Sequence, residues 1–129
     1  MATLTKLQAT ASFIVRESNG YRSRDDVTVT VPATTTYAAG TILGKITATG
    51  KFVRHAAGAT NGSEDEAGVL YETITNTTGS GVDNAAVNFA RDAEVNGHEL
   101  TYEIGADATQ ITASDSALSA LGIIVRKES

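Results

Sequence analysis

The chain has 129 residues and a formal net charge of −5 at pH 7, and 41% of its residues are hydrophobic. This length fits one domain with a real core, and the absence of cysteine excludes disulfides, zinc–thiolate sites and thiol nucleophiles. We expect neither a membrane span, which needs roughly 18 apolar residues in a row, nor a secretion signal. The acidic balance argues against nucleic-acid binding, which needs a basic surface.

The composition favours β-structure. Threonine (19 residues) and alanine (20) are abundant, glycine occurs 12 times, and there are one proline and one methionine. Threonine and valine fit strands better than helices, and frequent glycine is typical of the turns between short strands. We therefore predict a mainly β protein rather than a helical bundle.

The N-terminal residues have a different character from the rest. Residues 1–12 are small and polar and show no periodic pattern, which is typical of a mobile terminus. They lead into a three-residue apolar run over 13–15. Two interpretations stay open: the run adds a strand to the edge of another protein's sheet, or it is the first strand of this domain. We divide the chain into an N-terminal arm over 1–25, mobile when free, and a β-rich domain over 26–129.

Alternation and turn residues predict the strands that follow. Over 26–31 the valines share one face and the threonines the other, as in a half-buried strand, and Pro32 ends it. Residues 41–54 predict a hairpin that turns at Thr49-Gly50, and Gly44 indicates a bulge or a close backbone contact. Further strands are expected over 67–72, 85–91, 99–103 and 123–125.

One short helix is expected near the C-terminus. Ser114 or Asp115 can cap it, Leu118 and Leu121 lie on one side, and Gly122 occupies the position where helices commonly end. We expect seven or eight short strands in addition to this helix, and long polar loops connect these elements. There is no internal repeat.

Charge is distributed unevenly along the sequence. Residues 1–54 carry 7 Lys and Arg against 3 acids, whereas residues 55–115 carry one Arg against 11 acids. One interpretation is ordinary surface solvation. The other is a polar molecule with a basic end that meets a partner and an acidic end that faces solvent.

No residue pattern predicts catalysis, a metal or a cofactor. His55 and His98 lack a carboxylate at ligand spacing, and we interpret both as exposed loop residues. The acids over 64–66 lack the alternating pattern of a calcium loop and predict a solvated tip. The Asn61-Gly62-Ser63 and Asn76-Thr77-Thr78 sequences match the glycosylation pattern but are interpreted as turns.

Five stretches, taken in order, resemble the bacteriophage head decoration protein family that includes the lambda head decoration protein. Each is a turn followed by a strand, and the last ends in Gly-Ile-Ile-Val-Arg. They run over 19–29, 39–47, 68–72, 90–96 and 120–126.

This resemblance implies a fold and a function. The family has a compact body of the β-clip type and forms homotrimers that bind the major capsid protein. The homotrimers bind to the outside of the expanded head, at its three-fold and quasi-three-fold sites, and stabilise the head against DNA pressure. The implied location is the outer capsid surface of the virion, after synthesis in the host bacterial cytoplasm. No enzyme activity, cofactor, nucleic-acid contact or membrane contact is implied. The residues expected to bind the capsid are Phe13, Ile14, Val15 and Arg16.

Two other classes of function compete with this one. A trimeric β-clip enzyme of the dUTPase type would need Asp, Ser and aromatic-tail motifs, which we do not find. A carbohydrate-binding β module on a particle surface would need clustered Trp or Tyr, and this chain has no Trp and four scattered Tyr.

Overall fold

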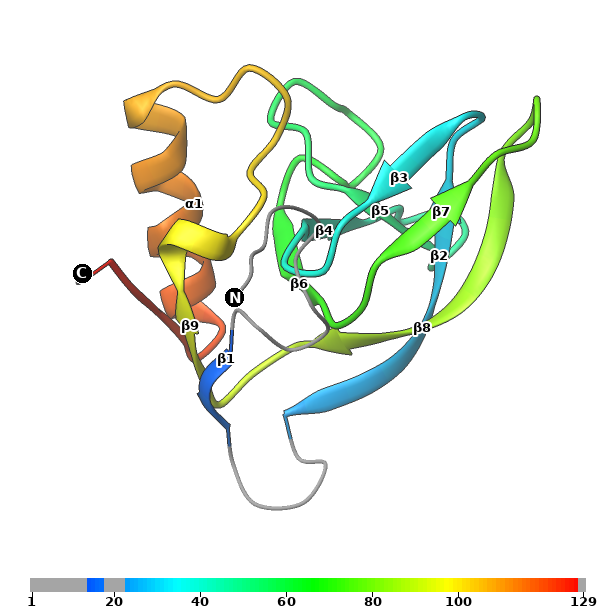
Figure 1. The fold of residues 1–129 in the computed structure, drawn as a ribbon. Coiled ribbons are helices and arrows are strands. Elements are labelled where there is room, and N and C mark those ends of the chain that lie inside the picture. The colour runs from blue at the N-terminus through cyan, green and yellow to red at the C-terminus, as the bar shows by residue number, and fades with distance from the viewer. Residues whose placement is uncertain (1–13, 18–22, 128–129) are drawn as a thin grey trace, which may run out of the picture.

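A computed structural model describes residues 14–17 and 23–127, with the side chains of 15–17 outside the description. Within these ranges the fold is mainly β, with one α-helix near the C-terminus, as predicted (Figure 1). The β-clip type stays a prediction. The strands form a five-stranded closed barrel, a three-stranded sheet and a two-stranded pair.

The barrel is built on one long antiparallel pair. Strands β2 and β8 are paired along all eight residues, from Arg24 opposite Phe89 to Val31 opposite Val82. A single parallel bridge between Val29 and Phe52 closes the ring. Val29 and Val31 are fully buried, which confirms the alternation predicted over 26–31. Around the barrel the strands are β2 (Arg24–Val31), β5 (Phe52–Arg54), β4 (Ile42–Lys45), β6 (Glu66–Leu70) and β8 (Val82–Phe89).

The predicted hairpin over 41–54 is confirmed by the antiparallel pairing of β4 with β5. The irregularity expected at Gly44 is also present, since the register between β4 and β6 shifts there. A Cβ atom at Gly44 would lie 2.5 Å from the carbonyl oxygen of Ser63. Glycine therefore lets the 55–65 loop pack directly on the barrel.

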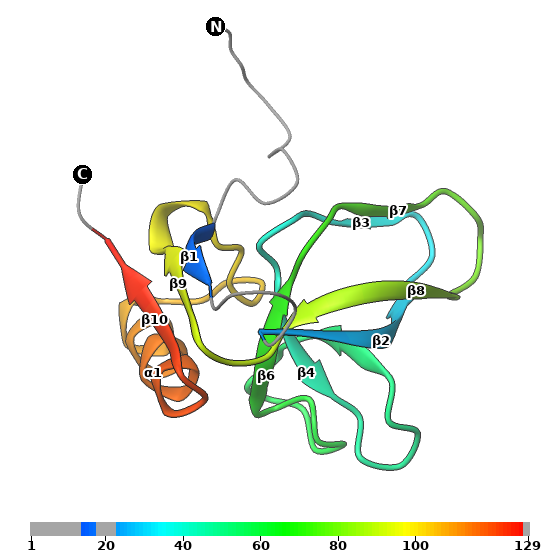
Figure 2. The ribbon, with the colours of Figure 1, turned by 90° about the horizontal axis from the view of Figure 1, so that it is seen from below.

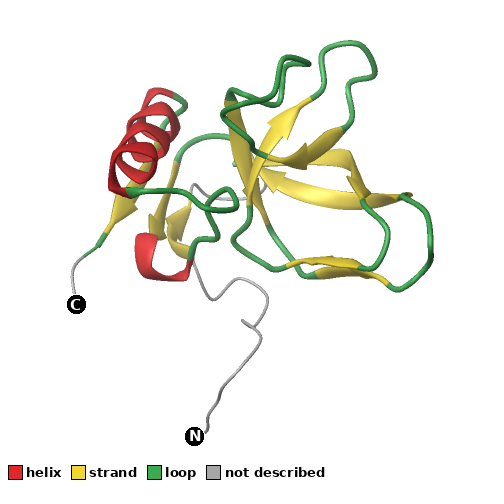
Figure 3. Ribbon diagram, turned by 90° about the horizontal axis from the view of Figure 1, so that it is seen from above, coloured by secondary structure: helices red, strands yellow, loops and turns green. Residues whose placement is uncertain are grey.

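The three-stranded sheet lies beside the barrel and gathers strands from both ends of the chain (Figure 2). Its middle strand is β9 (Ala93–Asn96), which pairs antiparallel with β1 (Ile14–Glu17) and parallel with β10 (Ile123–Arg126). Helix α1 (Ala108–Ala120) packs against β10. Figure 3 shows this helix and sheet on one side of the molecule and the barrel on the other.

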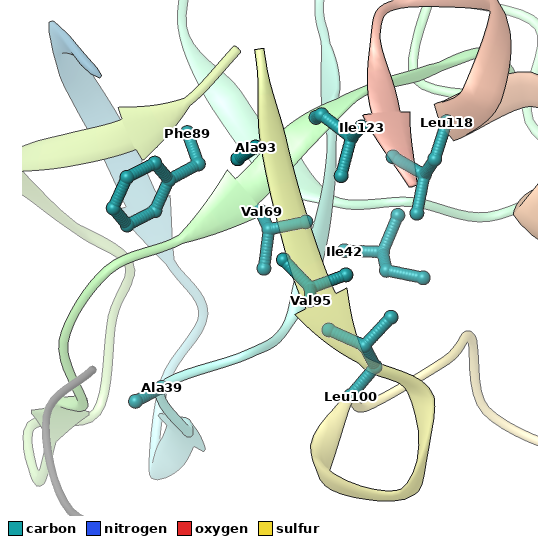
Figure 4. Packing of buried hydrophobic residues seen from close by; sticks show 9 residues of the cluster. All are labelled: Ala39, Ile42, Val69, Phe89, Ala93, Val95, Leu100, Leu118 and Ile123. Atoms are coloured by element: carbon teal, nitrogen blue, oxygen red, sulfur yellow. The ribbon is translucent and has the colours of Figure 1, made fainter. Parts of the chain in front are cut away.

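Two hydrophobic clusters form the core. One fills the barrel and includes Val29, Leu43 and Leu70. The other lies between the barrel, the three-stranded sheet and α1, where Ile42 and Val69 meet Leu118 (Figure 4). Because barrel residues belong to this second cluster, the sheet and helix share a continuous apolar interior with the barrel.

The helix prediction was wrong at its start. Helix α1 begins about two turns before Ser114, with Asp107 as the N-cap, and the Asp107 and Gln110 side chains form a reciprocal capping box. Its first turns are Thr-rich and only weakly amphipathic, so apolar spacing does not reveal them. The predicted end is correct, because Gly122 follows the helix with a φ of 90°. No helix among the described residues is long and apolar enough to cross a membrane.

Some strand predictions were also wrong. The segment predicted as a strand over 99–103 instead contributes to a 3-10 helix, η1 (Gly97–Glu99), and makes one isolated bridge at Thr101. Strand β9 and the pair formed by β3 (Thr35–Tyr37) and β7 (Ile74–Asn76) were not predicted, since each has only three or four residues. The turns at Asn61 and Asn76 are confirmed.

Candidate functional site

The residues predicted to bind a capsid fall on strand β1 or just before it. Ile14 is partly buried against the second core cluster and is opposite Val95 of β9. The backbone of Arg16 is opposite Glu94. Phe13 and the side chains of Val15 and Arg16 lie outside the described residues. Ile14 and Val15 of the run thus lie in a strand that pairs within this chain, as in the second of the two interpretations above.

Strand β1 is an edge strand of its sheet in the part of the chain that the structure describes. Within the described ranges, β9 is the partner of β1 and no strand pairs with its opposite edge. An edge strand presents a row of backbone N–H and C=O groups that another chain can extend. A strand that belongs to the domain can therefore still receive a strand from a partner.

On the barrel, the basic third and the acidic middle of the sequence lie side by side. Strand β2 from the basic third pairs along its whole length with β8 from the acidic middle. Lys51 forms an ion pair of 2.6 Å with Asp83, which joins the two segments across the barrel. This contact with the Lys51 ammonium lowers the pKa of the exposed Asp83 carboxyl, and a hydrogen bond from Thr30 adds to the effect. The two charge classes are interleaved at this surface.

A buried polar cluster lies where the barrel meets α1, and it was not predicted. His55 was interpreted as exposed, but its side chain is only 3% exposed. Its Nε2 atom lies 2.9 Å from the Glu64 carbonyl oxygen and 3.4 Å from Oε2 of Glu66. Ser114 of α1 donates to the same Glu66 oxygen at 2.5 Å. The prediction of a solvated acidic tip over 64–66 is therefore wrong for Glu66, while His98 is exposed as predicted.

The geometry of this cluster does not assemble a catalytic or metal site. Glu66 faces Nε2 of His55, whereas Glu103 faces Nδ1 at 3.7 Å, so the carboxylates lie against opposite ring nitrogens. The hydroxyl of Ser114 donates to a carboxylate and not to the imidazole, unlike an activated serine nucleophile. No group of three potential ligands suited to a metal ion occurs among the described residues. The cluster joins β6, α1 and the segment before α1 to the end of β5.

A family model described as bacteriophage lambda head decoration protein D matches residues 3–123. The chain belongs to this family. It is therefore a phage head decoration protein, of a structural family associated with the capsid of the virion. A search of the curated proteins finds no match.

Proposed function

We propose that this protein binds as a homotrimer to the outside of the expanded phage head, at three-fold and quasi-three-fold sites, and stabilises it against DNA pressure. The observation that carries the proposal is the family match across residues 3–123. A three-fold lattice position calls for a ligand with three-fold symmetry, and a closed trimer provides this with one repeated interface. The partner is the major capsid protein of the same phage, which the decoration protein meets after synthesis in the host cytoplasm.

The edge of β1 that has no partner strand in the described residues supports a specific docking mode. We infer that an extended segment of the capsid protein pairs with this edge and lengthens the three-stranded sheet by one strand. Phe13, Ile14, Val15 and Arg16 then supply main-chain hydrogen bonds and apolar contact. A single short strand binds weakly, because ordering each residue costs about 1–2 kcal/mol of backbone entropy. A trimer carries three such strands. When one of them binds, the other two are held near their own sites at a high effective concentration, so the trimer as a whole attaches firmly.

The first experiment measures co-sedimentation of the purified protein with expanded empty capsids and with unexpanded proheads. We expect saturable binding to expanded capsids at three copies per three-fold site, and little binding to proheads. Binding to neither particle, or one monomer per site, would overturn the proposal. Thermal disruption of the capsids, with and without saturating protein, measures the stabilisation.

Two truncations separate the contribution of β1 from that of the residues before it. Removing 2–12 keeps β1, and removing 2–16 leaves only Glu17 of this strand. We expect the longer deletion to reduce capsid binding much more than the shorter one. Circular dichroism monitors the barrel in both variants, because Ile14 also contacts the core. Equal capsid binding by the two variants would show that β1 is not the docking strand.

A further inference from the structure

A pocket lies beside the buried side chain of His55. It has a volume of about 290 Å³, enough for several water-sized groups. Residues from β3, the end of β5 and the segment before α1 line it, so three parts of the chain converge there. Its principal lining residues are Pro32, Tyr37, Arg54, His55, Glu103 and Ile104.

Three buried polar atoms on these lining residues have no hydrogen-bond partner in the described part of the chain. They are Nε of Arg54, Nδ1 of His55 and Oε2 of Glu103. Their side chains are well enclosed, since His55 is 3% exposed and Glu103 is 11% exposed. Buried polar atoms are nearly always hydrogen-bonded in folded proteins, so three unpartnered ones at one pocket indicate a missing partner group.

The hydrogen bonds of His55 determine which kind of group is missing. A carbonyl oxygen can only accept, so the contact with the Glu64 carbonyl requires Nε2 of His55 to carry a proton and donate. In the neutral ring Nδ1 is then an acceptor, and it faces another acceptor, Oε2 of Glu103, at 3.7 Å. A proton on Nδ1 would make this contact an ion pair, but 3.7 Å is too long for a hydrogen bond, so both atoms still lack one.

One external group that both donates and accepts, such as a water molecule or a primary carboxamide, can satisfy all three atoms. A nitrogen placed about 2.9 Å from each atom can reach both Nδ1 of His55 and Oε2 of Glu103. The remaining atom, Nε of Arg54, is a donor and needs an acceptor. A primary carboxamide has an NH₂ group for the first two and an oxygen for the third. A carboxylate would add a further acceptor, and an ammonium group would bring no acceptor and would repel Arg54.

An exposed apolar side chain lies at the rim of the pocket. Ile104 is 85% exposed, the most exposed of the large hydrophobic side chains among the described residues. Tyr37 forms part of the wall, with the Arg54 guanidinium 5.1 Å from the centre of its ring. A partner segment seated in the pocket would also cover this isoleucine and bury its apolar surface.

We propose that this pocket binds the side-chain carboxamide of an Asn or Gln residue from the capsid protein, with Ile104 covered by the same segment. The amide donates to His55 and Glu103 and accepts from Arg54. The choice of capsid protein as the partner rests on the proposed function, whereas the amide chemistry rests on the pocket alone. The pocket would thus provide a second contact with the capsid protein, separate from the strand that pairs with β1.

The amide chemistry is tested without capsids. The full-length labelled protein is titrated with acetamide, and NMR follows the His55 ring nitrogens and the Ala57 amide, which donates to Glu103. We expect a saturable shift with acetamide and at least tenfold weaker responses to acetate and methylammonium. Glu103→Gln places an NH₂ group of the protein in the pocket and should remove the response, while Glu72→Gln, an exposed acid outside the pocket, should retain it. Equal responses to all three compounds, as from bound water alone, would overturn the proposal.

The partner is tested by capsid co-sedimentation and by the oligomeric state. Ile104→Ser changes an exposed side chain and should leave the fold intact, yet we expect it and Glu103→Gln to weaken capsid binding at least tenfold relative to Glu72→Gln. Wild-type binding by both variants would overturn the capsid contact. Dissociation of a trimer by Ile104→Ser would instead assign the pocket to a contact between copies and overturn the proposed partner. If the wild type itself does not bind capsids, the proposed function fails, and the acetamide titration still decides the chemistry of the pocket.

Discussion

The side-chain nitrogen of Asn76 lies 2.9 Å from the carbonyl oxygen of Val31, to which it donates a buried hydrogen bond. The same nitrogen also contacts the carbonyl oxygens of Pro32 and Ser80. The side-chain oxygen accepts from both the backbone N–H and the hydroxyl of Thr78. One buried amide thus fixes the end of β2, the end of β7 and the turn that leads to β8.

We expect Asn76→Ala to lower the free energy of unfolding by about 3 kcal/mol, because it leaves buried carbonyl groups without donors. Asn76→Asp keeps the acceptors for Thr78 but loses the donors, so it should destabilise as well. Asn84→Ala is the control, since Asn84 makes one exposed contact with Val82. Denaturant unfolding measures all three, and an Asn76→Ala protein as stable as the control would contradict the role assigned to this amide.

Gly68 should tolerate no side chain. Its φ is 151°, and a Cβ atom there would lie 2.0 Å from Oδ1 of Asn88 and 2.5 Å from the carbonyl oxygen of Phe89. We expect Gly68→Ala to cost at least ~2 kcal/mol of unfolding free energy through steric overlap between β6 and β8. Gly79→Ala is the matched control, because no atom lies within 4 Å of the added methyl group. Similar melting temperatures for the two variants would refute this expectation.

The stability of the protein should fall at high pH because of Tyr102. Burial raises the pKa of this phenol above its ordinary value of 10.0, and its hydrogen bond to Asp115 at 2.5 Å raises it further. The folded state holds the phenolic proton more tightly than the unfolded state does. This contribution is therefore complete below pH 10 and is lost as the pH rises above it.

Unfolding measurements from pH 8 to 11 test this dependence. We expect the wild type to lose stability more steeply above pH 10 than Tyr102→Phe, which has no proton to release. The variant should be less stable than the wild type near neutral pH, since it lacks the bond to Asp115. Parallel curves above pH 10 would show that another group causes the alkaline loss.

The capping box of α1 gives a further prediction. The Asp107 carboxylate accepts a bond of 2.8 Å from the Gln110 N–H, and the Gln110 side chain accepts one of 2.9 Å from the Asp107 N–H. We expect Asp107→Ala to destabilise the protein by about 1 kcal/mol. Ser116→Ala, at an exposed position within the helix, should change little. If the two substitutions have the same effect on thermal unfolding, the cap does not hold the helix.

The elements predicted correctly are those whose pattern is local. Alternating valines and threonines define β2, and Gly122 marks the end of α1, because face periodicity and glycine conformation act over neighbouring residues. Strands β3, β7 and β9 are too short for periodicity, and they form because distant segments offer them partners. Which strand pairs with β1 likewise depends on where β9 lies in the fold.

The candidate site was harder to predict than the strands, because it depends on contacts between residues that are far apart in the sequence. His55 follows a strand and precedes a Gly- and Ala-rich loop, which is typical of an exposed residue. It is buried because Glu66 and Glu103, 11 and 48 positions away in the sequence, converge on its two ring nitrogens. The pocket beside it combines residues from three separate parts of the chain. Histidine is a residue type that commonly occurs in functional sites, so the sequence could indicate His55 as a candidate. The sequence does not indicate which residues contact it.

Strand β9 has only four residues, yet it holds β1 on one side and β10 on the other. Strands from the two ends of the chain are therefore held together through one four-residue strand. If β9 opens locally, both neighbours lose their partner at once, while the β2–β8 ladder of the barrel keeps its own hydrogen bonds. The backbone amides that join β1, β9 and β10 by hydrogen bonds should consequently show a common free energy of opening in hydrogen exchange, as one cooperative unit distinct from the barrel.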